Sequence, residues 1–235
     1  FALVLRRLLE RLSAEGASYA EINVSAGVIL WRGLPLDEFF LAMAEEAEQG
    51  PLPVRFIFDA VRQFGLDHVE AVADAAVRWS HRGVVGFGIG GDEARGPARL
   101  YRQVFERVRD AGLAALPHGG ETTEPESVWE ALECGARRIG HGIRAVEDAA
   151  LLEELRRRDV ALEICITSNH RTGAAARYGE HPLRRILDAG VPVTGMRLEV
   201  RVEDLDARPR VDHHALPALA VLSANLCAIA THLDG

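Results

Sequence analysis

The sequence predicts an α/β protein, a TIM-type (β/α)8 barrel formed by a single domain over residues 1–235, with its first strand missing or displaced. Short apolar runs alternate regularly with helical patterns, which is typical of a parallel sheet with helical crossovers. Polar residues follow many of the expected strands, as at the carboxyl face of a barrel, whereas an open sheet gathers its site at one switch point. An open nucleotide-binding sheet would also often carry a G-x-G-x-x-G motif that opens a helix after an early strand, and no such motif opens a helix in this sequence.

Seven segments have the short apolar pattern of buried strands. They are residues 19–24, 54–58, 84–89, the run that ends at Leu116, the run around Ile139, residues 161–165 and residues 191–194. Seven strands is one fewer than a (β/α)8 barrel needs. We therefore expect the missing strand to lie before Phe1 or after Thr194.

Helical patterns fill the intervals between these strands. The first has leucines at helical spacing, which stop before Gly16. Further helices are predicted at residues 36–48, 69–79, 100–111, 125–134, 149–157 and 183–188. We expect a loop around Trp31 and Gly33. The regular alternation of strand and helix patterns ends at Thr194. The tail, 195–235, contains a charged segment and then an apolar stretch, 216–232, that is expected to be helical.

Charge and cysteine content limit the expected partners. Lys and Arg number 27 against 35 Asp and Glu, a formal net charge of −8, so a surface that neutralises nucleic-acid phosphates is not expected. The three cysteines show no paired metal spacing and suit a reducing cytoplasm. No apolar run approaches the ~20 residues that span a bilayer, and the first residues lack a signal-peptide layout. We expect a cytoplasmic protein without a membrane partner, and the sequence leaves its oligomeric state open.

Two histidines flanked by glycines follow neighbouring strands. One lies in His118-Gly119-Gly120-Glu121 and the other in Gly140-His141-Gly142. Adjacent strands lie ~4.8 Å apart, so the two imidazoles are expected to converge on one pocket. There, His118 could hold a metal or activate water while Glu121 donates and accepts a proton. The alternative is that His118 is an ordinary loop histidine and that Glu121 caps the helix that begins near Pro125.

Two other strand ends carry weaker signals. In Gly90-Gly91-Asp92-Glu93, glycine could let a backbone N–H approach a ligand closely, or the segment could be a tight turn followed by a helix cap. Ser168-Asn169 follows the strand at 161–165 and could serve as an ordinary helix N-cap.

Five motifs occur in a fixed order along the chain: Gly91-Asp92-Glu93, His118-Gly119-Gly120-Glu121, Gly140-His141-Gly142, Thr167-Ser168-Asn169 and His181-Pro182. Their order and spacing, across about residues 19–194, resemble the adenosine and adenine deaminase family of metal-dependent amidohydrolases. The resemblance implies a (β/α)8 barrel, a zinc ion, and a small-molecule purine substrate whose 6-amino group is hydrolysed to release ammonia.

The resemblance also implies a role for four residues. His118 matches a metal-ligand histidine. Glu121 matches the carboxylic acid that protonates the purine ring nitrogen, and His141 matches the histidine that orients the attacking water and helps to deprotonate it. Gly91 matches the glycine whose backbone contacts the purine.

Several positions depart from the family pattern. The His-x-His-Leu-Asp-Gly motif of the family's first strand does not precede Phe1, and Leu198 stands where the family has a ligand aspartate. Gly88 also replaces an aspartate. A catalytic zinc generally has three protein ligands. Of these, the resemblance identifies only His118 in this sequence.

Two questions stay open at this stage. Residues 232–235 read His-Leu-Asp-Gly, which either repeats half of the missing motif in a circularly permuted chain or is a coincidence in a C-terminal helix. The chain could also be truncated before Phe1 and altered after Thr194. Accordingly, the sequence predicts either a zinc-dependent purine aminohydrolase or a catalytically inactive or incomplete barrel of the same family that acts as a binding module.

Overall fold

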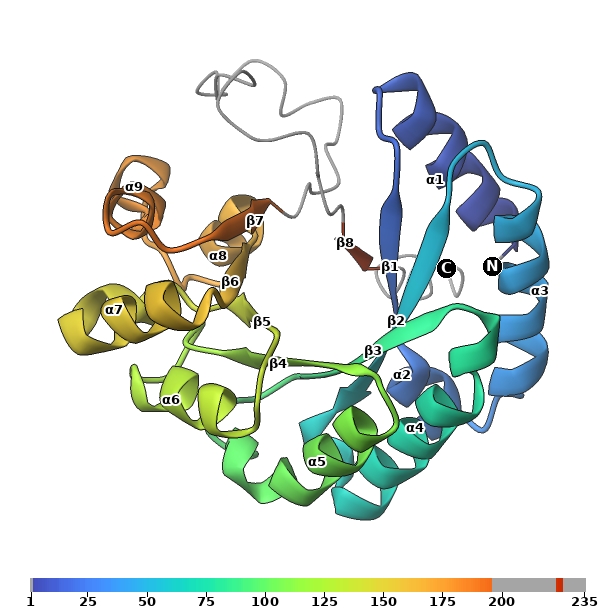
Figure 1. Ribbon diagram of the computed structural model, residues 1–235, viewed down its shortest axis with the longest axis horizontal. Coiled ribbons are helices and arrows are strands. Elements are labelled where there is room, and N and C mark those ends of the chain that lie inside the picture. Colours follow the sequence, from blue (N-terminus) through green and yellow to red (C-terminus); the bar gives the residue numbers. More distant parts are fainter. Residues whose placement is uncertain (1, 196–222, 226–235) are drawn as a thin grey trace.

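The computed structural model describes residues 2–195 and 223–225. In Figure 1 the strands form one curled sheet, and helices α3 to α7 lie along the outside of the curve. Within the described residues the sheet has eight strands in the order β7-β6-β5-β4-β3-β2-β1-β8, and every neighbouring pair is parallel. Consecutive strands from β1 to β7 are therefore neighbours, as the helical crossovers of a barrel require.

The strand bounds follow the apolar segments of the sequence closely. The strands are β1 (Ala20–Val24), β2 (Val54–Val61), β3 (Val84–Gly90), β4 (Ala114–Gly119), β5 (Arg138–His141), β6 (Ala161–Ile164), β7 (Val193–Gly195) and β8 (Ser223–Asn225). The eighth strand lies after Thr194, at one of the two places where the strand count predicts it.

The helices pack their apolar faces onto this sheet. They are α1 (Ala2–Ala14), α2 (Ala26–Trp31), α3 (Leu36–Glu48), α4 (Leu66–Arg78), α5 (Arg102–Asp110), α6 (Glu126–Glu133), α7 (Ala149–Arg158), α8 (Ile166–Arg171) and α9 (Leu183–Asp188). In α3, for example, the ring of Phe40 is fully buried and meets Phe56 and Phe58 of β2 edge to face, at centroid distances of 5.1 and 4.9 Å. Among the described residues, no helix is long and apolar enough to cross a membrane.

Two expectations from the sequence are wrong. The segment before Gly33 is not all loop, because residues 26–31 form helix α2, which buries Ile29. Within the stretch 216–232 that we expected to be helical, residues 223–225 form strand β8, which pairs with β1 through Ala224 and Ile22. The rest of that stretch lies outside the described residues.

A buried ion-pair network connects β1 with distant strands of the sheet. Arg138 of β5 contacts Glu163 of β6 through Nε, at 2.5 Å, and Glu21 of β1 through Nη2, at 2.5 Å. Both glutamate residues are less than 10% exposed. Because three strands separate β1 from β5 in the sheet order, Arg138 ties together two parts of the curl that share no backbone hydrogen bonds.

Candidate active site

His118 and His141 lie side by side at the carboxyl ends of β4 and β5. The two strands are in register through His118 and Gly140, and the ring centroids are 5.1 Å apart. A Cβ on Gly140 would lie 2.5 Å from Cδ2 of His118, so the imidazole requires glycine at this position. His141 itself has a φ of 64°, a strained left-handed conformation that is more common at functional sites. The glycines around the histidines thus make room for the rings.

The ring of His118 is held in its neutral state. Burial lowers its pKa to about 3, and the electrostatic influence of the neighbouring His141 and Arg62 acts in the same direction. The guanidinium of Arg62 donates hydrogen bonds to the backbone oxygens of His118 and Gly96. A neutral imidazole is the form that binds a metal ion.

Glu121 faces His141 and does not cap a helix. Its Oε2 lies 3.3 Å from Nε2 of His141, and its Oε1 lies 3.1 Å from the hydroxyl of Thr172 in the turn after α8. At the start of α6, the hydroxyl of Ser127 instead accepts a hydrogen bond from the backbone of Gly120, at 2.7 Å. The alternative in which Glu121 is a helix cap is therefore wrong, because the N-cap residue of α6 is Pro125 and no side chain among the described residues caps this helix. Glu121 belongs instead to a histidine cluster, which comprises His118, Glu121, His141, Asn169 and His181.

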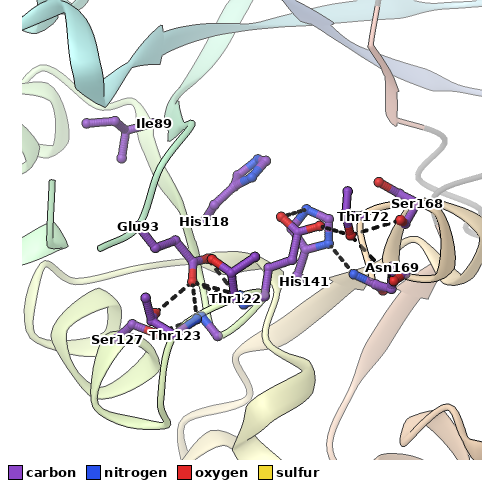
Figure 2. Close-up of polar contacts among 12 residues, drawn as sticks. Ile89, Glu93, His118, Thr122, Thr123, Ser127, His141, Ser168, Asn169 and Thr172 are labelled. Atoms are coloured by element: carbon purple, nitrogen blue, oxygen red, sulfur yellow. Dashed lines mark hydrogen bonds and ion pairs between the residues drawn. The ribbon is translucent and has the colours of Figure 1, made fainter. Parts of the chain in front are cut away.

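Glu93, which lies in one of the five sequence motifs but was given no role of its own, organises the loop that carries Glu121. Its buried carboxylate accepts hydrogen bonds from the backbone N–H groups of Glu121, Thr122 and Thr123, each at 3.2 Å, and from the Thr123 hydroxyl at 2.7 Å. Figure 2 shows these contacts converging on one carboxyl group. Three successive amides that point at one anion form a concave cradle for negative charge. The loop after β3 therefore fixes the loop after β4.

Asn169 does not form the helix N-cap that was one possibility for Ser168-Asn169, and lies against His141 instead. It lies inside α8, is fully buried, and makes no N-cap; its Nδ2 lies 2.9 Å from Nδ1 of His141. Its Oδ1 lies 3.2 Å from Nε2 of His181. A buried asparagine next to a histidine-bearing strand end is a signal that becomes visible only once the fold is known.

Gly91 has a local structural explanation. Its φ is +95°, a conformation that favours glycine, and an added Cβ would lie 2.0 Å from Oε1 of Gln63. That same oxygen accepts a hydrogen bond from the backbone N–H of Asp92, at 3.1 Å. Gly91 thus permits a close approach between the loops after β2 and β3.

Asp59 of β2 introduces a carboxyl group into the same region. It is in register with Gly88, and a Cβ on Gly88 would lie 2.8 Å from Oδ1 of Asp59. A Cβ on Gly90 would lie 3.3 Å from Oδ2 of Asp59 and 3.6 Å from Nδ1 of His118, so both groups border one small space. Burial raises the pKa of Asp59 to about 7, although the charge of Arg62 opposes the shift. The aspartate that the family pattern places at position 88 is absent, and Asp59 supplies a carboxyl group close by.

A catalytic zinc would require more ligands than the described residues supply. In residues 2–195 and 223–225, no group of three or more His, Cys, Asp or Glu side chains is placed to hold a metal ion. His118 has the chemistry of a zinc ligand but is a single imidazole. Leu198 and the acidic and histidine residues of the tail lie outside the described residues, so this donor set is incomplete for zinc.

Comparisons with known proteins agree with the fold and the motifs. A family model described as adenosine deaminase matches residues 1–195. A putative adenosine/adenine deaminase from Streptomyces virginiae is 38% identical over 198 residues, which cover 80% of this chain and 58% of the relative.

Two solved structures have the same fold as this chain. The crystal structure of adenine deaminase from Arthrobacter aurescens aligns with a TM-score of 0.76 and 28% identity, covering 83% of this chain and 61% of that protein. An amidohydrolase from Burkholderia ambifaria with bound Zn shares the fold, with a TM-score of 0.74 and 20% identity over 83% of this chain and 56% of that protein.

The chain spans less than two thirds of the length of each of these three proteins. The structural neighbours confirm the TIM-barrel fold class, here as a curled sheet that represents part of a barrel. The family model covers all strands from β1 to β7 and every residue of the histidine cluster. This chain therefore belongs to the adenosine deaminase family.

Proposed function

We propose that this protein catalyses the hydrolytic deamination of the 6-amino group of adenine, adenosine or a related purine. The observation that supports the proposal most strongly is the placement of Glu121 3.3 Å from His141, with the neutral ring of His118 beside them. A carboxyl group, a second imidazole and a candidate metal ligand thus share the carboxyl edge of two adjacent strands, where barrel enzymes place their chemistry.

The proposed reaction consumes one water and releases one ammonia. As the water oxygen bonds to C6 of the purine, the electron pair of the adjacent C=N bond moves to the ring nitrogen, which must gain a proton. Glu121 donates that proton and then accepts the proton that the water loses, while His141 orients the water by a hydrogen bond. When the C6–N bond breaks, the proton of the new C6 hydroxyl moves to the amino group, which leaves as ammonia.

We further propose that the reaction depends on zinc, with His118 as one of its ligands. Zinc acts as a Lewis acid and lowers the pKa of water in such sites. The remaining ligands would have to come from outside the described residues. The structure of an amidohydrolase of the same fold with bound Zn supports a metal-dependent reaction. Gly91 is proposed to contact the purine through its backbone.

Ammonia release tests the proposal directly. The chain is purified with zinc supplementation, its bound metal is measured, and it is incubated with adenine or adenosine. We expect ammonia from one of these purines and a loss of about 10²–10⁴-fold in kcat for Glu121→Gln, the usual contribution of a general acid. Glu124→Gln, three residues away with a side chain that is 74% exposed, is the matched control and should retain the wild-type rate.

Ammonia release, measured together with purine binding, also distinguishes the deaminase from a barrel that only binds a purine. A barrel that acts as a binding module would bind a purine in equilibrium dialysis and release no ammonia with zinc present. That result would remove the deaminase proposal and leave the binding function.

A further inference from the structure

We propose that Asn169 and His181 are positioning residues that hold His141 in the tautomer with its proton on Nε2, the nitrogen that faces Glu121. The importance of this tautomer for catalysis rests on the proposed function, but the tautomer itself follows from hydrogen bonds alone. Three links, each fixed by the one before it, lead from a backbone amide to the Glu121–His141 contact.

The first link fixes His181. The backbone N–H of Leu183, which can only donate, lies 3.1 Å from Nδ1 of His181. Nδ1 must therefore present its lone pair, and the single proton of the neutral ring is on Nε2. Burial lowers the pKa of His181, which agrees with a neutral ring. His181 thus presents an N–H donor at Nε2.

The second link fixes the side-chain amide of Asn169. Nε2 of His181 lies 3.2 Å from Oδ1 of Asn169, and a protonated nitrogen requires an acceptor there. The amide nitrogen is consequently directed at Nδ1 of His141, 2.9 Å away. Asn169 is fully buried, so the amide cannot exchange these partners for water without leaving a polar group unsatisfied. The orientation of this amide, usually ambiguous, is determined by its two neighbours.

The third link fixes His141. Because the Asn169 amide donates to Nδ1, that nitrogen carries no proton, and the ring proton is on Nε2, 3.3 Å from Oε2 of Glu121. Nε2 can then donate a hydrogen bond to that oxygen. With the other tautomer, Nε2 would present a lone pair and could not donate to it. Figure 2 shows Asn169 and His141 adjacent at this end of the cluster.

For the proposed reaction, the consequence is that Nε2 of His141 acts as a hydrogen-bond donor. Nε2 of His141 orients one oxygen of Glu121, or an attacking water, by donating a hydrogen bond. The other Glu121 oxygen, Oε1, faces the Thr172 hydroxyl at 3.1 Å. The two oxygens of Glu121 therefore have different partners, and His181 and Asn169 act on the reaction only through His141.

Nitrogen-15 NMR of the histidine rings tests the proposal without any turnover. The full chain is labelled, treated with a chelator to remove metal, and its long-range ring correlations are recorded; His141→Gln identifies the His141 signals by their loss. We expect a protonated Nε2 and an unprotonated Nδ1 for His141. In Asn169→Asp, the carboxylate accepts from Nδ1, so the proton should move to Nδ1 and the two nitrogen shifts should exchange.

The variants at His181 keep the test decisive if Asn169→Asp does not fold. His181→Leu removes the donor to Oδ1 and should give His141 a mixture of both tautomers, whereas His181→Gln keeps a side-chain N–H donor and should restore the wild-type signals. The matched control is His68→Gln, which removes a different half-buried imidazole that bonds the backbone of Gly27 and should leave His141 unchanged.

Two results would overturn the proposal: a proton on Nδ1 of His141 in the wild-type chain, or unchanged His141 ring shifts in His181→Leu. Neither depends on ammonia release. An inactive protein with the expected tautomer would reject the proposed function alone, and an active protein with the other tautomer would reject the inference alone.

Discussion

Glu93 and Thr123 are joined by two hydrogen bonds to a single oxygen, from the backbone N–H at 3.2 Å and from the hydroxyl at 2.7 Å. Glu93 follows β3 and Thr123 follows β4, so the contact links the loops at the carboxyl ends of two neighbouring strands. Because the same carboxylate also accepts from the backbone of Glu121, the position of the proposed catalytic acid depends on a residue 28 positions earlier in the chain.

The first prediction concerns this carboxylate. Glu93→Gln replaces one of the two acceptor oxygens by an amide donor and removes the charge, so the amides of Thr122 and Thr123 lose part of their partner. We expect a loss of about 1–3 kcal/mol in the free energy of unfolding and faster hydrogen exchange at both amides. Urea denaturation and NMR exchange measure the two effects. Glu106→Gln on the exposed face of α5 is the control, and equal exchange rates in both variants would contradict the assigned role.

A second prediction concerns the ion pairs that cross the curl. Arg138→Met leaves the carboxylates of Glu21 and Glu163 buried without their partner, which we expect to cost about 3–5 kcal/mol in the free energy of unfolding. Adding Glu21→Gln and Glu163→Gln to that variant should recover much of the loss, because the uncompensated charges are removed. If the triple variant is no more stable than Arg138→Met in urea denaturation, the loss is not electrostatic.

The space between β2 and β3 gives a third prediction. Gly88→Ala places a methyl group 2.8 Å from Oδ1 of Asp59 and should destabilise the fold by about 1–3 kcal/mol. In an Asp59→Ala background the same substitution should cost less, with a coupling of about 0.5–3 kcal/mol in a double-mutant cycle. Gly179→Ala, where an added Cβ has no neighbour within 4 Å, is the control. Purely additive effects would show that Asp59 does not occupy this space.

The raised pKa of Asp59 gives a fourth prediction, on how the free energy of unfolding depends on pH. Burial raises its pKa in the folded protein to about 7, above the value of about 4 in an unfolded chain. Between these values the folded state binds the proton more tightly, so the contribution of Asp59 to the free energy of unfolding is present at low pH and falls as the pH rises to about 7, by up to about 4 kcal/mol. Asp59→Asn should abolish this decline.

The measurement is urea denaturation of both proteins from pH 4 to pH 8. Other groups titrate in this range, so the difference between wild type and Asp59→Asn is the relevant quantity, and Asp110→Asn on the surface serves as the control. A difference that does not change with pH would show that Asp59 stays ionised throughout.

The sequence predicts those parts of the fold that are determined locally. The helix expected at residues 36–48 coincides with α3, because its apolar positions have helical spacing and Phe40, Met43 and Ala44 are buried in the observed helix. The six-residue helix α2 was missed because it is too short to show a period. It forms where Gly27 packs closely against β2: a Cβ at this position would lie 3.0 Å from the backbone nitrogen of Val61.

In the candidate site, too, some residues are predictable from the sequence and others are not. His118 and His141 were visible because glycines flank both and each ends a strand. Glu93 and Asn169 lie in sequence motifs, but their contacts with Thr123 and His141 are not predictable, because these partners lie 28 to 30 residues away and no spacing in the sequence relates them. Long-range pairing of this kind is created by the register of the parallel strands, which the sequence pattern alone does not fix.

Product analysis in oxygen-18 water tests the central claim most directly. The zinc-supplemented chain is incubated with adenine or adenosine, and the products are examined by mass spectrometry. We predict a purine that has lost its amino group and carries one oxygen-18 atom from the solvent, formed by wild type and by Glu124→Gln but not by Glu121→Gln. Recovery of unchanged purine from a folded, zinc-loaded wild-type protein, or equal product from Glu121→Gln, would contradict the account.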